Sequence, residues 1–183
     1  MKSLSVCVFC GSRSGGKPEY ELAARTLGNG IGQRKWRLVY GAGDVGLMGS
    51  VAISTQAQGS ETFGVIPTHL IHKEVAKRDL TQFIVTDNMH ERKKVMFMNS
   101  DAIVLLPGGA GSLDEFFEVL TWAQLDLHEK PLLLVNVANY WSPLISLIDH
   151  VILEGFAEKS IKNLFKVVDS AEDALATIQT RLV

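Results

Sequence analysis

The 183-residue sequence has little net charge, no long apolar run and no low-complexity segment, and each absence excludes a class of protein. A formal net charge of −2 gives no general basic field, so we expect no binding to long nucleic acids. No apolar run approaches the roughly 20 residues that a membrane-spanning helix needs, and the N-terminal residues do not form a targeting signal. With 46% hydrophobic residues, the chain is neither disordered nor fibrous. We therefore expect a soluble, cytoplasmic protein without a membrane partner.

Cysteine is also scarce, and the only two, Cys7 and Cys10, form a C-x-x-C pair. Such a pair can indicate redox or metal chemistry. Redox pairs lie at helix starts, whereas this pair lies inside a predicted strand, where residues three apart point to opposite faces and are about 10 Å apart. We interpret both as buried strand residues. None of the five histidines forms a recognisable ligand set with cysteine or carboxylate, so we expect no metal site.

Short apolar runs alternate with segments of helical period along the whole chain. The predicted strands are Leu4–Phe9, Arg37–Tyr40, Glu61–Ile66, Gln82–Thr86, Ala102–Leu106, Leu132–Val135 and Phe165–Val168. The predicted helices are Pro18–Gly28, Gly46–Gln58, Met89–Asn99, Ser112–Leu125, Tyr140–Gly155 and Ala171–Thr180. The strands lack a period of two, which is typical of strands covered by helices on both sides. The sequence therefore predicts one α/β domain over residues 1–183, with a doubly wound, mostly parallel sheet of about seven strands.

Glycine clusters follow three of the predicted strands. Gly11 and Ser12 follow the first strand, Gly41–Gly43 follow the second, and Gly108–Gly111 follow the fifth. In a parallel sheet these turns lie at the carboxyl edge, where doubly wound folds bind ligands. Glycine lets the backbone approach a phosphate closely and present N–H groups to it. One cluster alone could be a tight turn, but three at one edge indicate a site for a phosphorylated nucleoside.

The second cluster reads G-A-G-D-V-G over Gly41–Gly46, which matches the dinucleotide fingerprint G-x-G-x-x-G. It follows the second strand rather than the first. About 20 residues further on stand Val65, Ile66 and Pro67, with no acidic residue to hold a ribose. We therefore expect no nicotinamide or flavin cofactor.

The predicted helix at Met89–Asn99 opens with the charged run His90–Lys94. Cations near a helix start oppose the helix dipole. A solvated face explains Lys93 or Lys94, but Arg92 shares a stripe with Met96 that should point inward. An inward arginine needs an anionic partner. The candidates for that partner are Glu74, Glu115 and a ligand phosphate.

Ser112 and Glu115 form an S-x-x-E pattern ahead of an apolar-periodic helix, which is the signature of a capping box. In this interpretation Ser112 is the N-cap. The functional interpretation places Ser112 on a phosphate and Glu115 at a reacting sugar. The two interpretations are compatible, because a cap would place both side chains beside the glycine loop.

Several motifs resemble the "Lonely guy" (LOG) family of cytokinin riboside 5′-monophosphate phosphoribohydrolases. Pro107–Glu115, P-G-G-A-G-S-L-D-E, resembles the family's PGGxGTxxE motif, and Met89–Lys93 resembles its second motif. Further matches in the family's order are Val8–Ser12, Val39–Gly41, Gly46–Gly49, Gly64–Pro67 and Leu120–Leu125. The resemblance extends from Val6 to about Phe156.

The resemblance implies a Rossmann-like homodimer without a cofactor. It would cleave the N-glycosidic bond of adenosine 5′-monophosphate or an N6-substituted analogue, releasing the base and ribose 5-phosphate. By motif, the catalytic residues would be Arg92, Glu115 and Glu74. The residues that hold the phosphate would be Gly108, Gly109, Gly111 and Ser112. The other substrate-binding residues would be Gly11, Ser12, Gly41, Gly43, Met89 and Lys93.

The departures from the family pattern are few. Ser112 replaces a threonine and keeps the hydroxyl, Ala42 replaces a glycine, and Arg13 stands where a small residue is common. The last two leave the preference between AMP and N6-substituted nucleotides open. Leu120, Trp122 and Leu125 lie on one helix with more apolar surface than one sheet face needs, which favours the implied dimer.

Two other functions compete with hydrolysis. Members of the family have carried the label lysine decarboxylase, but a pyridoxal phosphate enzyme needs a Schiff-base lysine with supporting contacts. Lys93 and Lys94, in a cationic cluster, are better explained by an anionic ligand. A non-catalytic carrier of a nucleotide or phosphorylated cofactor stays the alternative, because Rossmann-like carriers share the glycine loops. The pair Arg92 and Glu115 favours the enzyme.

Overall fold

The computed structural model describes residues 3–71 and 75–183. Its strands are β1 (Ser5–Phe9), β2 (Arg37–Tyr40), β3 (Thr62–Pro67), β4 (Gln82–Thr86), β5 (Ala102–Leu105), β6 (Leu132–Val135) and β7 (Lys166–Val168). Its α-helices are α1 (Pro18–Gln33), α2 (Gly46–Ala57), α3 (Met89–Met98), α4 (Ala110–Gln124), α5 (Ser142–Leu153) and α6 (Ala171–Leu182). Short 3₁₀ helices are η1 (Thr68–Leu70), η2 (Val137–Asn139) and η3 (Lys159–Asn163). The alternation of strand and helix is the one that the sequence predicts.

All seven strands pair in parallel, in the order β4-β3-β2-β1-β5-β6-β7. The chain runs outward from β1 through β2 and β3 to β4, then returns to the other side of β1 to form β5. The direction of winding therefore reverses between β1 and β5, which pair from Val6 with Ala102 to Phe9 with Leu105. In open parallel sheets this reversal leaves a crevice at the carboxyl ends of the two strands, where ligands bind.

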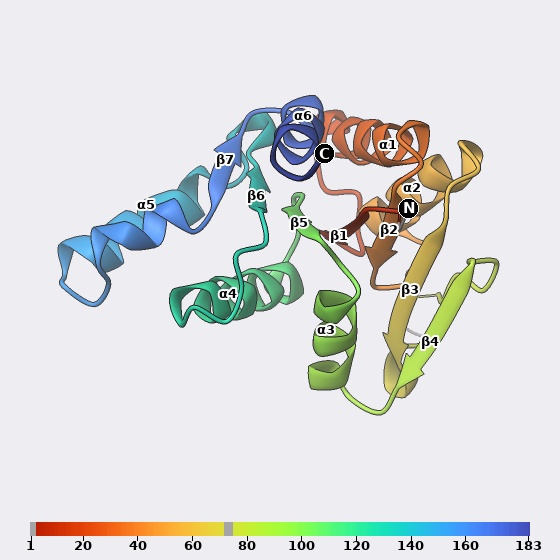
Figure 1. Ribbon diagram of the computed structural model, residues 1–183, viewed down its shortest axis with the longest axis horizontal. Coiled ribbons are helices and arrows are strands. Elements are labelled where there is room, and N and C mark those ends of the chain that lie inside the picture. Colours follow the sequence, from red (N-terminus) through yellow and green to blue (C-terminus); the bar gives the residue numbers. More distant parts are fainter. Residues whose placement is uncertain (1–2, 72–74) are drawn as a thin grey trace.

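Helices cover both faces of the sheet, as predicted (Figure 1). One core cluster joins α1, α2 and α6 to one face, and the other joins α3, α4 and α5 to the opposite face. Val6 and Val8 of β1 point into the first cluster, whereas Cys7 and Phe9 point into the second. Strands sealed on both sides need no polar alternation, which explains their continuous apolar sequences.

The two cysteines lie in separate cores. Cys7 belongs to the cluster under α3, α4 and α5, and Cys10 belongs to the cluster under α1 and α2. Both are free and buried. Burial is the main cause that raises the pKa of the Cys7 thiol well above its ordinary value, so the reactive thiolate is disfavoured. The interpretation of both cysteines as buried is confirmed, but only Cys7 lies in β1, and Cys10 directly follows that strand.

The predicted boundaries of α1 and α4 are wrong, and those of α5 and α6 differ by two residues at one or both ends. Helix α1 continues past Gly28 to Gln33, because close packing against α2 and α6 overrides the low helix propensity of its glycines. Helix α4 begins at Ala110, two residues before the predicted start at Ser112. None of the helices formed by residues 3–71 and 75–183 is long and apolar enough to cross a bilayer.

Candidate active site

A cavity of about 900 Å³ opens at the carboxyl ends of β1 and β5, where the winding of the sheet reverses. Its walls come from the loops after β1, β2 and β5, from the first turns of α2, α3 and α4, and from residues just before α5. The predicted site residues that line it are Gly11, Ser12, Gly41, Met89, Arg92, Gly108, Gly109, Gly111, Ser112 and Glu115. One cavity therefore contains most of the residues that the motifs single out.

The loops after β1 and β5 are bonded directly to each other. The N–H of Gly11 donates to the carbonyl oxygen of Pro107 at 3.0 Å. Gly108 fills the narrow space between them, where an added Cβ would overlap the hydroxyl of Ser112 and lie 3.0 Å from the Gly11 nitrogen. Only glycine fits this close approach, so the glycine loop packs directly against the first turn of α4.

The start of α4 is open toward this wall. Gly109 is the N-cap and makes no side-chain hydrogen bond, and the first turn carries no acidic residue. The expected capping box is therefore wrong: Ser112 stands inside the first turn, and Glu115 lies one turn further along the helix. The N–H groups of a helix start carry partial positive charge and suit an anion. Here they lie beside the buried hydroxyl of Ser112, which is 4% exposed.

Arg92 crosses the site from α3. Its Nε donates to the carbonyl oxygen of Val65 at 3.1 Å, and its Nη2 donates to that of Gly41 at 2.8 Å. The side chain is 3% exposed and lies next to the core residue Met96, so the predicted inward stripe is confirmed. Two carbonyl oxygens of the backbone thus fix the position of the guanidinium. This arrangement gives the cavity a fixed buried cation.

Glu115 supplies an acidic group from the second turn of α4. The residue is 8% exposed and lines the cavity with Arg92. Its negative charge also raises the pKa of the Cys7 thiol in β1, as the second largest cause after the burial of that thiol. A cation and a carboxylate thus share one buried site, where charges act more strongly than in water.

Two predicted site residues in the described part of the chain do not line the cavity. Gly43 is buried and pairs through a β-bridge with Ala76 of the segment that follows β3. Lys93 is turned toward α4, where its Nζ lies 2.9 Å from a carboxylate oxygen of Asp114 and 3.0 Å from one of Glu118. Glu74 lies outside the described residues.

Lys93 is also buried, so the solvated face that was expected for it is wrong, whereas Lys94 is exposed. Burial lowers the pKa of Lys93, but the hydrogen bonds with Asp114 and Glu118 outweigh it and raise the pKa above its ordinary value. Lys93 is therefore a cation that links α3 to α4.

The dinucleotide fingerprint at Gly41–Gly46 is not open to a pyrophosphate. The first N–H groups of α2, from Leu47 and Met48, donate to the carbonyl oxygen of Gly11 at 3.1 and 3.3 Å. The carbonyl oxygen of Gly41 accepts from Arg92. The N–H groups at the start of α2 and the Gly41 carbonyl are therefore hydrogen-bonded within the protein. No group of three or more histidine, cysteine or acidic residues that could hold a metal occurs within residues 3–71 and 75–183.

Sequence reasoning missed several cavity residues. The largest are Tyr20 on α1 and Tyr140 before α5, whose rings meet edge to face at 5.3 Å. Leu70 reaches the cavity from η1, and Met48 from α2. Tyr140 follows two residues with positive φ, Ala138 and Asn139, and no local pattern predicts that turn. A periodicity search finds core positions, not side chains that loops bring to a cavity.

Comparison with known proteins identifies the family. A sequence profile of the family described as "Possible lysine decarboxylase" matches residues 48–178. The "Probable cytokinin riboside 5'-monophosphate phosphoribohydrolase LOG4" of Oryza sativa subsp. japonica is 41% identical over 174 residues, which cover 95% of this chain and 76% of that protein. The chain belongs to the LOG family. A second LOG relative, the "Cytokinin riboside 5'-monophosphate phosphoribohydrolase LOG7" of Arabidopsis thaliana, is 40% identical over 95% of this chain and 80% of its own length.

Solved structures beyond the LOG enzymes share the fold. The molybdenum cofactor binding protein of Rippkaea orientalis superposes with a TM-score of 0.76 at 22% identity, over 100% of this chain and 99% of that one. The molybdenum cofactor carrier protein of Chlamydomonas reinhardtii gives 0.72 at 19% identity, over 98% of each chain. At such identities the likeness concerns the fold alone, and it confirms the doubly wound α/β architecture.

Proposed function

We propose that the protein hydrolyses the N-glycosidic bond of adenosine 5′-monophosphates, including N6-substituted ones, to the free base and ribose 5-phosphate. The observation that carries this proposal is the burial of Arg92 and Glu115 in one cavity with the glycine loop and the open start of α4. The LOG relatives, at about 40% identity over 95% of the chain, are named for the same reaction on cytokinin riboside 5′-monophosphates.

The substrate's phosphate binds at Gly108–Ser112, against the first N–H groups of α4 and the Ser112 hydroxyl. This contact is remote from the bond that breaks, and it supplies binding energy that holds the sugar in place. The ribose then lies toward Glu115, one turn further along α4. The base extends toward the apolar side chains of Met48, Leu70 and Met89, which line the rest of the cavity.

Cleavage leaves positive charge on the ribose ring as the electrons of the N-glycosidic bond depart with the base. The carboxylate of Glu115 stabilises that charge and helps water to attack the anomeric carbon. Water supplies the hydroxyl of ribose 5-phosphate, and the base takes up a proton. Arg92, held by two carbonyl oxygens, orients the carboxylate and offsets the negative charge of the leaving base. Glu74 stays a predicted catalytic residue on the resemblance alone.

The direct test is chromatography of the products after incubation with AMP, an N6-alkyl AMP and adenosine. We expect free base and ribose 5-phosphate from both nucleotides, with adenosine hydrolysed far more slowly. The matched control is Glu115→Gln, which keeps the shape of the side chain. Equal rates on AMP and adenosine would reject the phosphate role of Gly108–Ser112. No base from any of the three substrates would reject the enzyme.

A carrier without catalysis is the second candidate, because proteins that bind or carry the molybdenum cofactor have this fold. Their identity of 22% or less supports the fold and no function. A carrier needs neither a buried arginine nor a buried glutamate beside its phosphate loop. Binding of AMP without release of adenine over prolonged incubation would favour the carrier.

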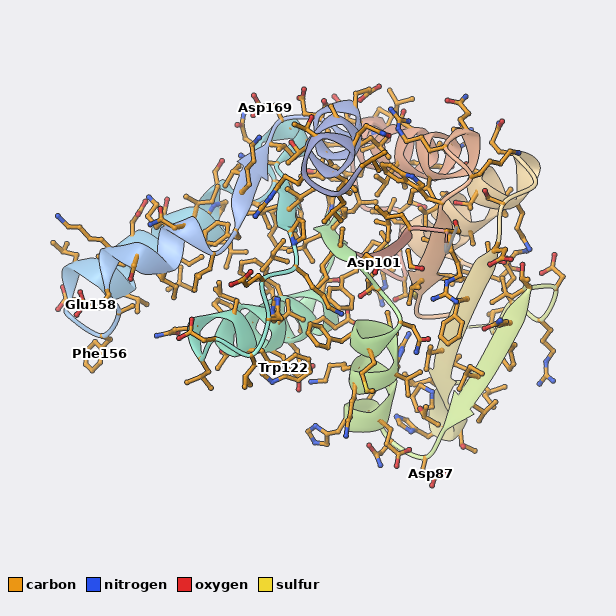
Figure 2. All side chains as sticks on the ribbon, viewed as in Figure 1. Asp87, Asp101, Trp122, Phe156, Glu158 and Asp169 are labelled. Carbon is orange, nitrogen blue, oxygen red and sulfur yellow. The ribbon has the colours of Figure 1, made fainter. Side chains whose placement is uncertain are left out.

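We also propose that the protein forms a homodimer in the cytoplasm. Leu125 and Leu127, at the end of α4, are 63% and 67% exposed, and two such leucines favour a covered surface. The expected contribution of Leu120 is wrong, since that residue is buried in the core. Trp122 of α4 lies toward α3 (Figure 2), and its ring centroid is 4.8 Å from that of Phe97. Sedimentation of an active monomer near 20 kDa would reject the dimer. The free buried cysteines are compatible with a reducing compartment.

A further inference from the structure

Tyr140 makes a contact that the proposed mechanism does not use. Its hydroxyl donates to the carbonyl oxygen of Gly108 at 2.5 Å, across 32 residues of sequence. The ring lines the cavity and packs edge to face on Tyr20 at 5.3 Å and on Trp141 at 4.7 Å. The aromatic neighbours fix the ring, so the hydroxyl is held at one point of the glycine loop.

The backbone before Tyr140 adopts an unusual conformation that delivers the ring to this point. Ala138 and Asn139 both have positive φ, 50° and 58°, which residues with a Cβ adopt rarely. The side chain of Asn136 secures the turn by accepting from the N–H of Trp141 at 2.7 Å and donating to the Ser142 hydroxyl at 3.3 Å. Two consecutive strained residues persist only where surrounding contacts over-determine them. Strain of this kind is concentrated at functional sites.

The bonded carbonyl belongs to the peptide between Gly108 and Gly109. A peptide flanked by two glycines has few steric barriers against rotation, because neither neighbour carries a Cβ. Rotation would exchange the directions of the Gly108 carbonyl and the Gly109 N–H, which point opposite ways across a trans peptide. At a phosphate site such an exchange would replace a donor with a carbonyl oxygen that repels the anion. The Gly109 carbonyl is already held by the N–H of Leu113 at 3.1 Å. Tyr140 holds the peptide before it.

We propose that Tyr140 is a positioning residue that locks the Gly108–Gly109 peptide in the orientation that binds the substrate's phosphate. This inference rests on the proposed function, because it assigns the phosphate to that loop. Tyr140 acts through the loop and not on the sugar. Its loss weakens the binding of phosphorylated ligands and leaves nucleosides unaffected.

The test compares the wild type with Tyr140→Phe, which keeps the ring and removes only the hydroxyl. The matched control is Thr180→Val, which removes a hydroxyl bonded to the Ala176 carbonyl at 2.9 Å on α6, away from the cavity. Calorimetric titration with ribose 5-phosphate, well below the melting temperature of each variant, measures binding without turnover. Rates on AMP and adenosine are measured in parallel.

We expect Tyr140→Phe to bind ribose 5-phosphate about tenfold more weakly and to raise KM for AMP by a similar factor, the size of one lost hydrogen bond near a charge. Adenosine hydrolysis and the control variant should not change. Wild-type affinity in Tyr140→Phe, or an equal loss on AMP and adenosine, would overturn the proposal. If the wild type binds ribose 5-phosphate but releases no base, the proposed function fails, and the binding comparison still decides the role of Tyr140. If the wild type does not bind ribose 5-phosphate, the proposal for Tyr140 fails, whereas release of base from AMP still decides the proposed function.

Discussion

Gly41 offers a way to displace Arg92 without mutating it. The Gly41 carbonyl accepts from Nη2 of Arg92 at 2.8 Å, so the guanidinium lies against the backbone of the loop after β2. A Cβ at Gly41 would overlap Nη2 and would lie 3.0 Å from the guanidinium carbon and 3.1 Å from the sulfur of Met48. Ordinary contacts begin near 3.4 Å. In Gly41→Ala the guanidinium must therefore move by at least about 1 Å.

The magnitudes follow from what this displacement breaks. The overlapping atom is the end of a flexible side chain, so the fold can yield, and one charge-assisted hydrogen bond worth about 1.5–3 kcal/mol is lost. At about 2–4 °C per kcal/mol for a chain of this size, the melting temperature should fall by roughly 3–12 °C. Misplacing a group at the reacting centre by 1 Å can cost about a hundredfold in rate. We therefore expect a folded variant with hardly any turnover.

The assay is a double-mutant cycle of Gly41→Ala and Arg92→Ala, with AMP turnover and thermal melts measured on all four proteins. If Gly41→Ala acts by moving the guanidinium, it should cost little further turnover in the Arg92→Ala background. Additive losses of turnover would mean that the methyl group acts on something else. Near-wild-type turnover in Gly41→Ala alone would refute the role of Arg92 at its present position.

Three more outcomes are expected. Glu115→Gln should lower AMP turnover by about a hundredfold or more. Its melting temperature should change little, because Glu115 is not part of a helix cap. Normal turnover in this variant would show that Glu115 has no role in the mechanism. Gly109→Ala should fold normally, because an added Cβ meets nothing within 4 Å and the φ of −98° suits alanine. Calorimetry should nevertheless show weaker binding of ribose 5-phosphate. Unchanged affinity would mean that the phosphate does not bind at Gly109. Lys93→Met should melt lower than the wild type at pH 7, because Asp114 and Glu118 lose their cation, while KM for AMP changes little. The pKa of Lys93 is raised in the folded protein, so the stability that its charge contributes is complete below pH 10.5 and is lost as the pH rises through the folded pKa. Thermal melts across that pH range should show the difference in melting temperature between the wild type and Lys93→Met shrinking.

The fold was predictable because its signals are redundant. The bounds of β2, β4 and β6 match those predicted, and the remaining strands differ by one or two residues. Most strands are short apolar runs that follow a helix-period segment, which is the pattern of parallel sheets buried on both faces. Where one signal stood alone, it failed: the propensity of Gly28 to end α1 was overridden by packing against α2.

Arg92 and Lys93 show the limit of sequence reasoning within one charged run. The inward stripe with Met96 predicts that Arg92 is buried, and it is. Lys93 directly follows Arg92 and does not belong to the inward stripe, so the same reasoning predicts that Lys93 lies at the surface. The structure buries Lys93 as well, because Asp114 and Glu118 of α4 compensate its charge. A buried cation is predictable only when its partners are known, and these partners lie more than 20 residues away in sequence.

The start of α4 shows why the S-x-x-E pattern at Ser112 and Glu115 predicted the wrong N-cap. S-x-x-E usually marks an N-cap, because an unsatisfied helix start is costly and a serine side chain is the usual remedy. Here the helix begins two residues earlier at Ala110, behind an N-cap, Gly109, with no side chain to satisfy its N–H groups. N–H groups that no side chain caps can bind an anion such as a phosphate. Ser112 and Glu115 are thereby displaced into the first and second turns, where they line the cavity. The S-x-x-E pattern thus fails at a helix whose first turn lines the cavity proposed for the substrate, as expected where function competes with stability.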